Sequence, residues 1–138
     1  LYTAERGQGA ELNGTKIKVS TIDDLGRGLL ATGFPYDLRA SRDNNLDFFS
    51  RFSLKAQAIR RAGSAALDLC YIASGRFDGY WEMKLRPWDV SAGSLIVAEA
   101  GGMVTDFSGG PFSIYGKECL ASNGLIHGEM ARILTGKA

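Results

Sequence analysis

Apolar and polar positions follow the periods of short strands in the first twenty residues. Extended segments around Leu1–Ala4 and Ala10–Leu12 are separated by glycines, and Asn13-Gly14 is a dipeptide typical of tight turns. The turn leads into residues 16–20, KIKVS, where apolar and polar side chains alternate. The pattern predicts a small antiparallel unit at this end of the chain.

Helical periods dominate four later segments. From Asn44 to Ala56 the apolar positions 46, 48, 49, 52 and 56 fall on one face of an amphipathic helix. Ser64 is typical of a helix N-cap, and the segment after it, AALDLCYIAS, is apolar nearly all round. We therefore expect the most buried helix of the chain there, ended by Gly75. Further helices are predicted over Val90–Ala100 and Ile126–Leu134.

Five apolar runs between and after these helices have the length of strands. We place them at Leu29–Phe34, Gln57–Arg60, Phe77–Glu82, Met103–Asp106 and Cys119–Ser122. Strands that alternate with helices are typical of α/β folds, in which helices cover a sheet. The sequence therefore predicts a layered α/β fold with a sheet of about four or five strands flanked by helices.

The composition narrows the class of protein. A chain of 138 residues with 45% hydrophobic content can bury one core. Its 16 basic and 15 acidic residues nearly cancel, which gives no electrostatic footprint for nucleic acid or an anionic membrane. The sequence has neither an apolar run that would span a bilayer nor a signal-peptide pattern. Cys70 and Cys119 lie far apart in apolar segments, so we expect free buried thiols in a cytoplasmic protein.

The stretch RPWDVSAGSLIVAEAGG, residues 86–102, places a carboxylate at the start of an apolar helix. The common interpretation of Asp89 is an N-cap that accepts a backbone N–H. A ligand role is the alternative: Trp88 beside it suggests a partly dry site, and Glu82 ends an aromatic strand where a carboxylate needs a partner. The end of that strand and the start of the helix can bring both carboxylates to one sheet edge, where α/β folds bind ligands.

A second candidate site is RRAGSAALD, residues 60–68. Its Gly-Ser-Ala run opens a helix, where free backbone N–H groups suit an anion or a hydroxyl-rich ligand. An ordinary Ser cap, with Asp68 favouring the helix dipole, explains the segment equally well. Arg60 and Arg61 are placed to face a phosphate, although surface arginines are usually just solvated.

Other chemistries fit the sequence poorly. His127 is the only histidine and has no evident Ser or Cys partner, which argues against a nucleophilic triad. There is no Cys/His cluster for zinc, and GQGAELNG, residues 7–14, matches no nucleotide-binding loop. Carboxylates remain, and they suit a hard cation such as Mg²⁺.

Three segments together resemble the inositol monophosphatase family of Mg²⁺-dependent, lithium-sensitive phosphatases. WDVSAGSLIVAEAGGMVTD resembles the family's C-terminal signature, RRAGSAALDLCYIASGRFDGYWE the segment before it, and LYTAERGQGAELNG strands further upstream. The similarity runs from Leu1 to about Leu134 and is highly specific. It implies the C-terminal half of the layered α/β/α/β/α sugar-phosphatase fold and a bacterial source.

The resemblance also implies a role for each candidate residue. Asp89 corresponds to the aspartate that coordinates catalytic metal, and Glu82 to the glutamate that contacts a ring hydroxyl of the substrate. Arg60 corresponds to an arginine that contacts substrate in bacterial relatives. The run that holds the hydroxylated ring corresponds to Gly63, Ser64 and Ala65.

Two family motifs, Gly-Glu-Glu and Asp-Pro-(Ile/Leu)-Asp-Gly-Thr, hold most of the metal in the family and do not occur in this sequence. We therefore expect residues 1–138 to be the C-terminal domain of a longer, homodimeric, Mg²⁺-dependent inositol monophosphatase-like protein, and expect this domain alone to be inactive. Fructose bisphosphate, a nucleotide 3′-phosphate and histidinol phosphate are alternative substrates. A non-catalytic folding or interaction module is the alternative outside enzymes.

Overall fold

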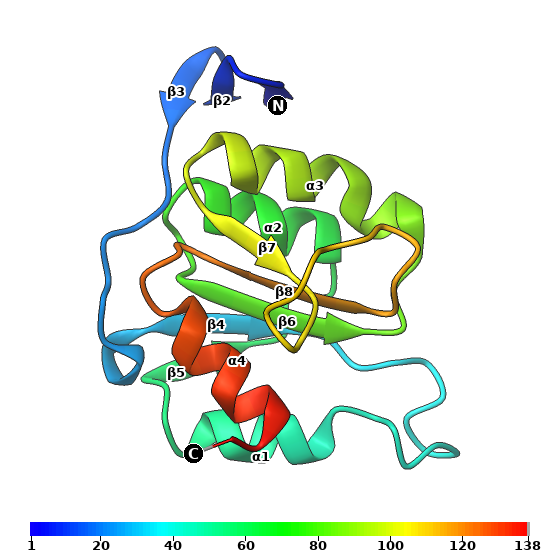
Figure 1. Cartoon of the computed structure of the whole chain (residues 1–138). Coiled ribbons are helices and arrows are strands. Elements are labelled where there is room, and N and C mark those ends of the chain that lie inside the picture. Colours follow the sequence, from blue (N-terminus) through cyan, green and yellow to red (C-terminus); the bar gives the residue numbers. More distant parts are fainter. Residues whose placement is uncertain (138) are drawn as a thin grey trace.

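Residues 1–137 are described by a computed structural model, and their strands form two separate sheets (Figure 1). The smaller sheet is antiparallel, in the order β1-β2-β3. Its strands span Tyr2–Glu5 (β1), Gly9–Leu12 (β2) and Thr15–Ile17 (β3). Asn13 and Gly14 join β2 to β3 with φ values of 52° and 80°, the conformation that tight hairpin turns require. The predicted small antiparallel unit is confirmed.

The larger sheet has five strands in the order β5-β4-β6-β8-β7. β4 pairs in parallel with β5 and with β6, whereas β8 runs antiparallel to β6 and to β7. A 3₁₀ turn over Leu25–Arg27 leads into β4. The strands span Leu29–Thr32 (β4), Ala58–Arg60 (β5), Gly79–Met83 (β6), Met103–Thr105 (β7) and Glu118–Ser122 (β8).

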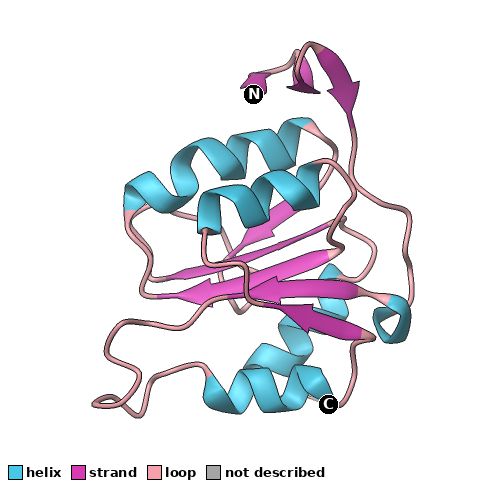
Figure 2. Ribbon diagram, turned by 180° about the vertical axis from the view of Figure 1, so that it is seen from behind, coloured by secondary structure: helices cyan, strands magenta, loops and turns pink. Residues whose placement is uncertain are grey.

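Helices cover both faces of this sheet, as Figure 1 and the reverse view in Figure 2 show. One face carries α2 (Ala65–Ala73) and α3 (Pro87–Glu99), and the other carries α1 (Leu46–Ser53) and α4 (His127–Thr135). The small sheet packs on the outer side of α3, through β1 and β2. The layers are therefore small sheet, helix pair, main sheet and helix pair, which confirms the predicted α/β fold.

The two-residue period of the strands divides the core into two clusters. On β4, Ala31 packs toward α2 and α3, whereas Leu30 packs toward α1 and α4. On β6, Tyr80 and Trp81 separate in the same way. Trp81 stacks on Phe52 of α1 with ring centroids 4.1 Å apart, an arrangement that contributes about 0.5–1.5 kcal/mol beyond area burial.

The sequence places the helix α2 accurately. The Ser64 hydroxyl accepts the Leu67 N–H at 3.3 Å, as an N-cap does, and Gly75 follows the last turn with a φ of +73°. Five of the nine residues of α2 are buried, against four of thirteen in α3, so α2 is the most buried helix as predicted. Gly93 lets the two helices approach closely, because a Cβ there would lie 2.6 Å from Leu69 Cδ1.

The start of α3 differs from the prediction. The helix begins at Pro87, three residues before Val90, and Arg86 is its N-cap residue. The physical reason is Pro87 itself, whose fixed φ and missing N–H suit the first helical position. Asp89 is therefore the third residue of the helix, and its expected role as N-cap is wrong.

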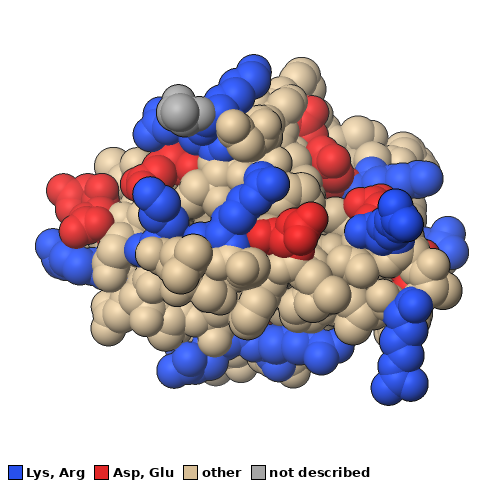
Figure 3. All heavy atoms as spheres, turned by 90° about the horizontal axis from the view of Figure 1, so that it is seen from below, with Lys and Arg blue, Asp and Glu red and all other residues tan. Residues whose placement is uncertain are grey.

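The cysteines are buried and most charged side chains lie at the surface. Both Cys70 and Cys119 are free and buried within the described chain. Figure 3 views the face that α1 and α4 cover, where basic and acidic side chains are interspersed. Among residues 1–137, every helix is too short or too polar to cross a membrane.

Candidate active site

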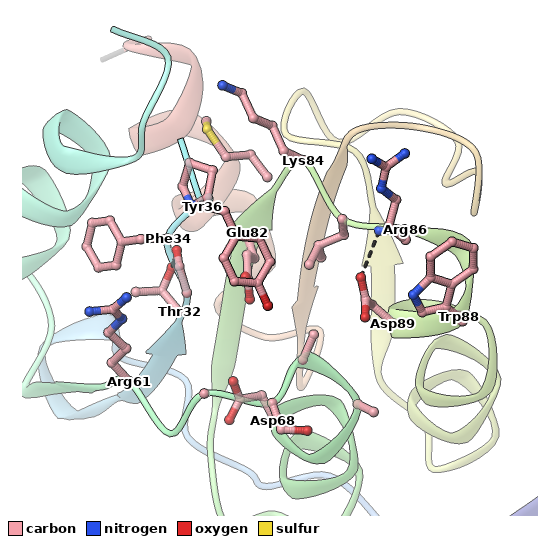
Figure 4. Close-up of a pocket in the computed structure, with 18 of the residues that line it drawn as sticks. Thr32, Phe34, Tyr36, Arg61, Asp68, Glu82, Lys84, Arg86, Trp88 and Asp89 are labelled. Carbon is pink, nitrogen blue, oxygen red and sulfur yellow. Dashed lines mark hydrogen bonds between the residues drawn. The ribbon is translucent and has the colours of Figure 1, made fainter. Parts of the chain in front are cut away.

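A cavity of about 550 Å³ opens where the carboxyl ends of β4 and β6 meet the amino ends of α2 and α3 (Figure 4). Parallel strands deliver their carboxyl ends to the same edge of a sheet, which is where α/β folds bind ligands. The lining consists of residues 32–37, 61, 63–66, 68, 82–86 and 88–89. Both predicted candidate stretches therefore contribute to one cavity.

Asp89 stands at the α3 side of this cavity. Its Oδ2 accepts the backbone N–H of Arg86 at 2.8 Å, so the carboxylate closes the first turn of the helix from inside (Figure 4). One oxygen satisfies the helix, and Oδ1 is left to meet a ligand in the cavity that Asp89 lines. The geometry therefore allows Asp89 both to accept the Arg86 N–H, as the third residue of α3, and to meet a ligand. Trp88, however, is 77% exposed, so the expectation that it keeps Asp89 dry is wrong for this chain.

Glu82 lies on β6 and is half-buried. Its Oε2 accepts the Tyr80 hydroxyl at 2.6 Å, which is the partner that a carboxylate in an aromatic strand needs. Burial raises the pKa of Glu82, against the lowering effect of the Tyr80 hydrogen bond. Gly33 makes room for the carboxylate, since a Cβ at that position would lie 2.2 Å from Glu82 Oε1. The side chain is therefore fixed between Tyr80 and the backbone at the end of β4.

A third carboxyl group, Asp68, lies in the first turn of α2 and lines the same cavity (Figure 4). It is 1% exposed. Burial raises its pKa to about 7, and repulsion by Glu82 adds to the effect. The sequence suggested for Asp68 merely a favourable position in the helix dipole, so its burial at a ligand site was missed.

The Gly-Ser-Ala run contributes backbone groups. Gly63, Ser64 and Ala65 all line the cavity. The first backbone bond of α2 runs from the Asp68 N–H to the Ser64 carbonyl, so the N–H groups of Ala65 and Ala66 precede the intrahelical ladder. These amino-terminal N–H groups suit a hydroxyl or an anionic oxygen.

The two arginines are separated by the structure. Arg60 is the last residue of β5, is exposed, and lies outside the cavity lining, so its assignment to the site is corrected. Arg61 follows directly, lines the cavity, and holds its guanidinium 5.0 Å above the Phe34 ring. Its positive charge lowers the pKa of Glu82. Consecutive residues leave a strand in opposite directions, which is why the neighbour of Arg60 reaches the site.

His127 has a serine partner that its sequence position did not reveal. Its Nδ1 shares a hydrogen bond with the Ser122 hydroxyl and its Nε2 one with the Thr105 hydroxyl, both at 2.8 Å. All three side chains are buried where the start of α4 meets β7 and β8, outside the cavity. A hydroxyl group stands where a triad has a carboxylate, and the Ser122 hydroxyl is buried away from the cavity, so this cluster does not have the arrangement of a nucleophilic triad.

A complete metal centre is not formed by the described residues. Within residues 1–137, no group of three or more His, Cys, Asp or Glu side chains is arranged to hold a metal ion. Mg²⁺ requires near-octahedral oxygen ligation, and one carboxylate at Asp89 does not satisfy it. Residues 1–137 therefore offer too few ligands to hold a Mg²⁺ ion by themselves.

Sequence comparisons agree with this architecture. The model of the inositol monophosphatase family matches residues 1–137. Phosphatase IMPL1, chloroplastic, from Arabidopsis thaliana is 45% identical over 91% of this chain and 34% of its own length. Nus factor SuhB from Escherichia coli (strain K12) is 50% identical over 80% of this chain and 41% of its own length.

Solved structures give the same result. The structure of inositol monophosphatase from Anabaena (Nostoc) sp. PCC 7120 matches 98% of this chain with a TM-score of 0.96 and 45% identity. The match covers 54% of that chain, so the present chain spans about half the length of this relative. Because the family model spans nearly every residue, the chain belongs to the inositol monophosphatase family.

Proposed function

We propose that this chain is the C-terminal, alcohol-binding part of a Mg²⁺-dependent phosphatase that hydrolyses inositol monophosphate to inositol and phosphate. The observation that carries the proposal is the convergence of Glu82, Asp89 and the N-terminus of α2 on one cavity. Carboxylates and free N–H groups are the partners that a polyhydroxylated alcohol needs. Family membership supports a phosphatase.

In this proposal each group of the chain has one role. Asp89 supplies one metal ligand through Oδ1, while Oδ2 remains bonded to the helix. Glu82 accepts a hydrogen bond from a ring hydroxyl, and Gly63, Ser64 and Ala65 hold the ring through their backbone. Arg61, which lines the cavity with its guanidinium over Phe34, would take the place of Arg60 as the arginine nearest the substrate. Mg²⁺ supplies the activation of water and the neutralisation of phosphate charge.

The remaining metal ligands would come from a preceding domain of the complete protein. Residues 1–138 alone are then expected to release no phosphate, because they offer Mg²⁺ too few ligands. Fructose bisphosphate, a nucleotide 3′-phosphate and histidinol phosphate remain alternative substrates. We further propose a cytoplasmic homodimer for the complete protein.

The test is Asp89→Asn in the complete protein. An Asn side chain at this position can still accept the Arg86 N–H, so a residue that only caps would be replaced with little effect. Loss of a metal ligand would instead lower phosphate release by orders of magnitude and shift the Mg²⁺ dependence. Asp106→Asn is a matched control, because Asp106 also accepts backbone N–H groups, from Ser108 and Gly110, outside the cavity. Wild-type turnover and Mg²⁺ response in Asp89→Asn would refute the ligand role.

A non-catalytic role is the second candidate, and the name Nus factor carried by the Escherichia coli relative favours testing it. An interaction module would tolerate loss of the cavity carboxylates. Unchanged cellular function of a catalytically silent Asp89→Asn protein would support that alternative.

A further inference from the structure

The carboxyl group of Asp68 is buried, and its Oδ1 has no hydrogen-bond partner among residues 1–137. A buried polar atom without a partner costs about 1–3 kcal/mol, so native structures retain few of them and those few need an explanation. Asp68 lines the cavity, and the missing partner is therefore to be sought in a ligand.

The surroundings of Asp68 offer no counter-charge. Burial raises the pKa of Asp68, and repulsion by Glu82, which lines the same cavity, adds to the rise (Figure 4). The Tyr80 hydroxyl is committed to Glu82 Oε2, and the Arg61 guanidinium rests over Phe34. The side chain therefore remains without an internal ion pair in the described chain, and burial favours its neutral form.

A neutral carboxyl group beside a carboxylate is a specific pattern. The first presents an O–H donor as well as an acceptor, and the second presents acceptors alone. Neighbouring hydroxyl groups of a polyol each donate and accept one hydrogen bond, so they match this pair. A phosphate oxygen, which only accepts, does not match Glu82.

We propose that Asp68 is a specificity-determining residue that hydrogen-bonds a second hydroxyl of the alcohol, next to the hydroxyl that Glu82 binds. The inference rests on the proposed function, since it assigns Asp68 to the alcohol end of the same cavity. It makes the site selective for alcohols with at least two neighbouring hydroxyl groups. Asp68 is retained at the expense of stability because it contributes this selectivity.

The experiment compares Asp68→Ala and Asp68→Asn with wild type in the complete protein. Mg²⁺-dependent phosphate release is measured for myo-inositol 1-phosphate and for p-nitrophenyl phosphate, whose leaving group has no further hydroxyl. The ratio of the two kcat/KM values should fall about threefold to tenfold in Asp68→Ala, the effect of losing one hydrogen bond between neutral groups. Asp68→Asn keeps a donor and an acceptor and should retain most of the selectivity. Asp47→Ala, on the exposed face of α1, is the control and should leave the ratio unchanged.

Thermal unfolding separates this role from a structural one. Asp68→Ala removes an unpartnered carboxyl group and introduces the best helix former, so the melting temperature should rise. A lower melting temperature together with an unchanged selectivity ratio would overturn the inference and make Asp68 structural.

Failure of the proposed function is recognised separately. If the wild-type protein releases no phosphate from either ester, the binding of free myo-inositol to the 138-residue chain, followed by NMR, decides the inference. Binding that is about threefold to tenfold weaker in Asp68→Ala supports the role of Asp68. Equal binding by wild type and Asp68→Ala overturns it.

Discussion

Titration of Asp68 should make the free energy of unfolding of the chain depend measurably on pH. In the folded protein burial raises the pKa of this carboxyl from 3.8 to about 7. Between these values the native state holds a proton that the unfolded state has released. Stability is therefore highest at low pH with respect to this group and is lost as the pH rises toward 7.

The size of the effect follows from the two pKa values. Each tenfold change in proton affinity corresponds to about 1.4 kcal/mol, so the full loss of stability between acid and alkaline pH is about 4 kcal/mol. Part of this loss has already occurred at pH 5, because the unfolded carboxyl ionises below that pH. Between pH 5 and pH 8 the remaining loss is about 2–3 kcal/mol.

Asp68→Asn isolates this contribution. The amide has the same shape and does not titrate, and its own burial cost does not vary with pH. Urea unfolding of both proteins at pH 5 and pH 8 gives the free energies of unfolding. The difference between variant and wild type should shift by about 2–3 kcal/mol in favour of the variant on going to pH 8. Contributions of the other carboxylates and of His127 cancel in this comparison.

A pH-independent difference would refute the reasoning. It would mean that Asp68 ionises in the folded chain as readily as in the unfolded one, so that a partner or water satisfies its carboxylate. The Asp68 Oδ1 atom would then have a hydrogen-bond partner in solution, and the selectivity role would lose its structural basis.

Three further predictions concern how the backbone builds the cavity. Gly93→Ala would place a Cβ 2.6 Å from Leu69 and force α2 and α3 apart. The free energy of unfolding in urea should fall by about 1–3 kcal/mol, less the gain from the better helix propensity of Ala. A stabilised variant would contradict the close packing. Gly33→Ala should displace the Glu82 carboxylate and change substrate preference in a phosphate-release assay, with a smaller effect on the melting temperature; an unaltered preference would show that Glu82 does not select the alcohol. Ser64→Ala should destabilise the chain by about 1 kcal/mol in thermal unfolding while Ser64→Thr retains most of the stability, and equal melting temperatures would exclude the cap.

Much of the architecture follows from local patterns. The strands and helices were predictable because one-sided and two-sided burial leave different periods in the sequence, as in the alternation of Leu30 and Ala31 and in the all-round apolar α2. The cap at Ser64 is equally local, since its hydroxyl and its acceptor lie three residues apart. The start of α3 was misplaced because the helix signal of Pro87 was outweighed by the carboxylate of Asp89.

Local sequence patterns could not predict the site residues whose positions depend on tertiary contacts. Nothing in the spacing of Arg60 and Arg61 states which of them leaves β5 toward the cavity. The burial of Asp68 depends on β6 lying across from α2, and the role of Gly33 on Glu82 filling the space of its missing side chain. Ser122 and His127 lie five residues apart on a strand and a helix, and the turn between them creates their contact.

The charges around the cavity connect these residues to the proposed metal dependence. Asp68, Glu82 and Asp89 all line the cavity, and the carboxylates of Glu82 and Asp89 make it less favourable for a phosphate dianion. Each basic side chain of the lining contacts another protein group or points away from the carboxylates. Lys84 pairs with Asp37 at 2.8 Å, and the Arg61 guanidinium lies over Phe34. The Arg86 guanidinium points away from Asp89 (Figure 4). A phosphate ester bound as proposed would therefore need positive charge beyond that of residues 1–137, whereas the hydroxyl groups of its alcohol would meet donors and acceptors in the cavity lining. This excess of negative charge in the cavity favours the proposed division of roles. The described residues would recognise the alcohol, and cations held largely by other parts of the protein would neutralise the phosphate.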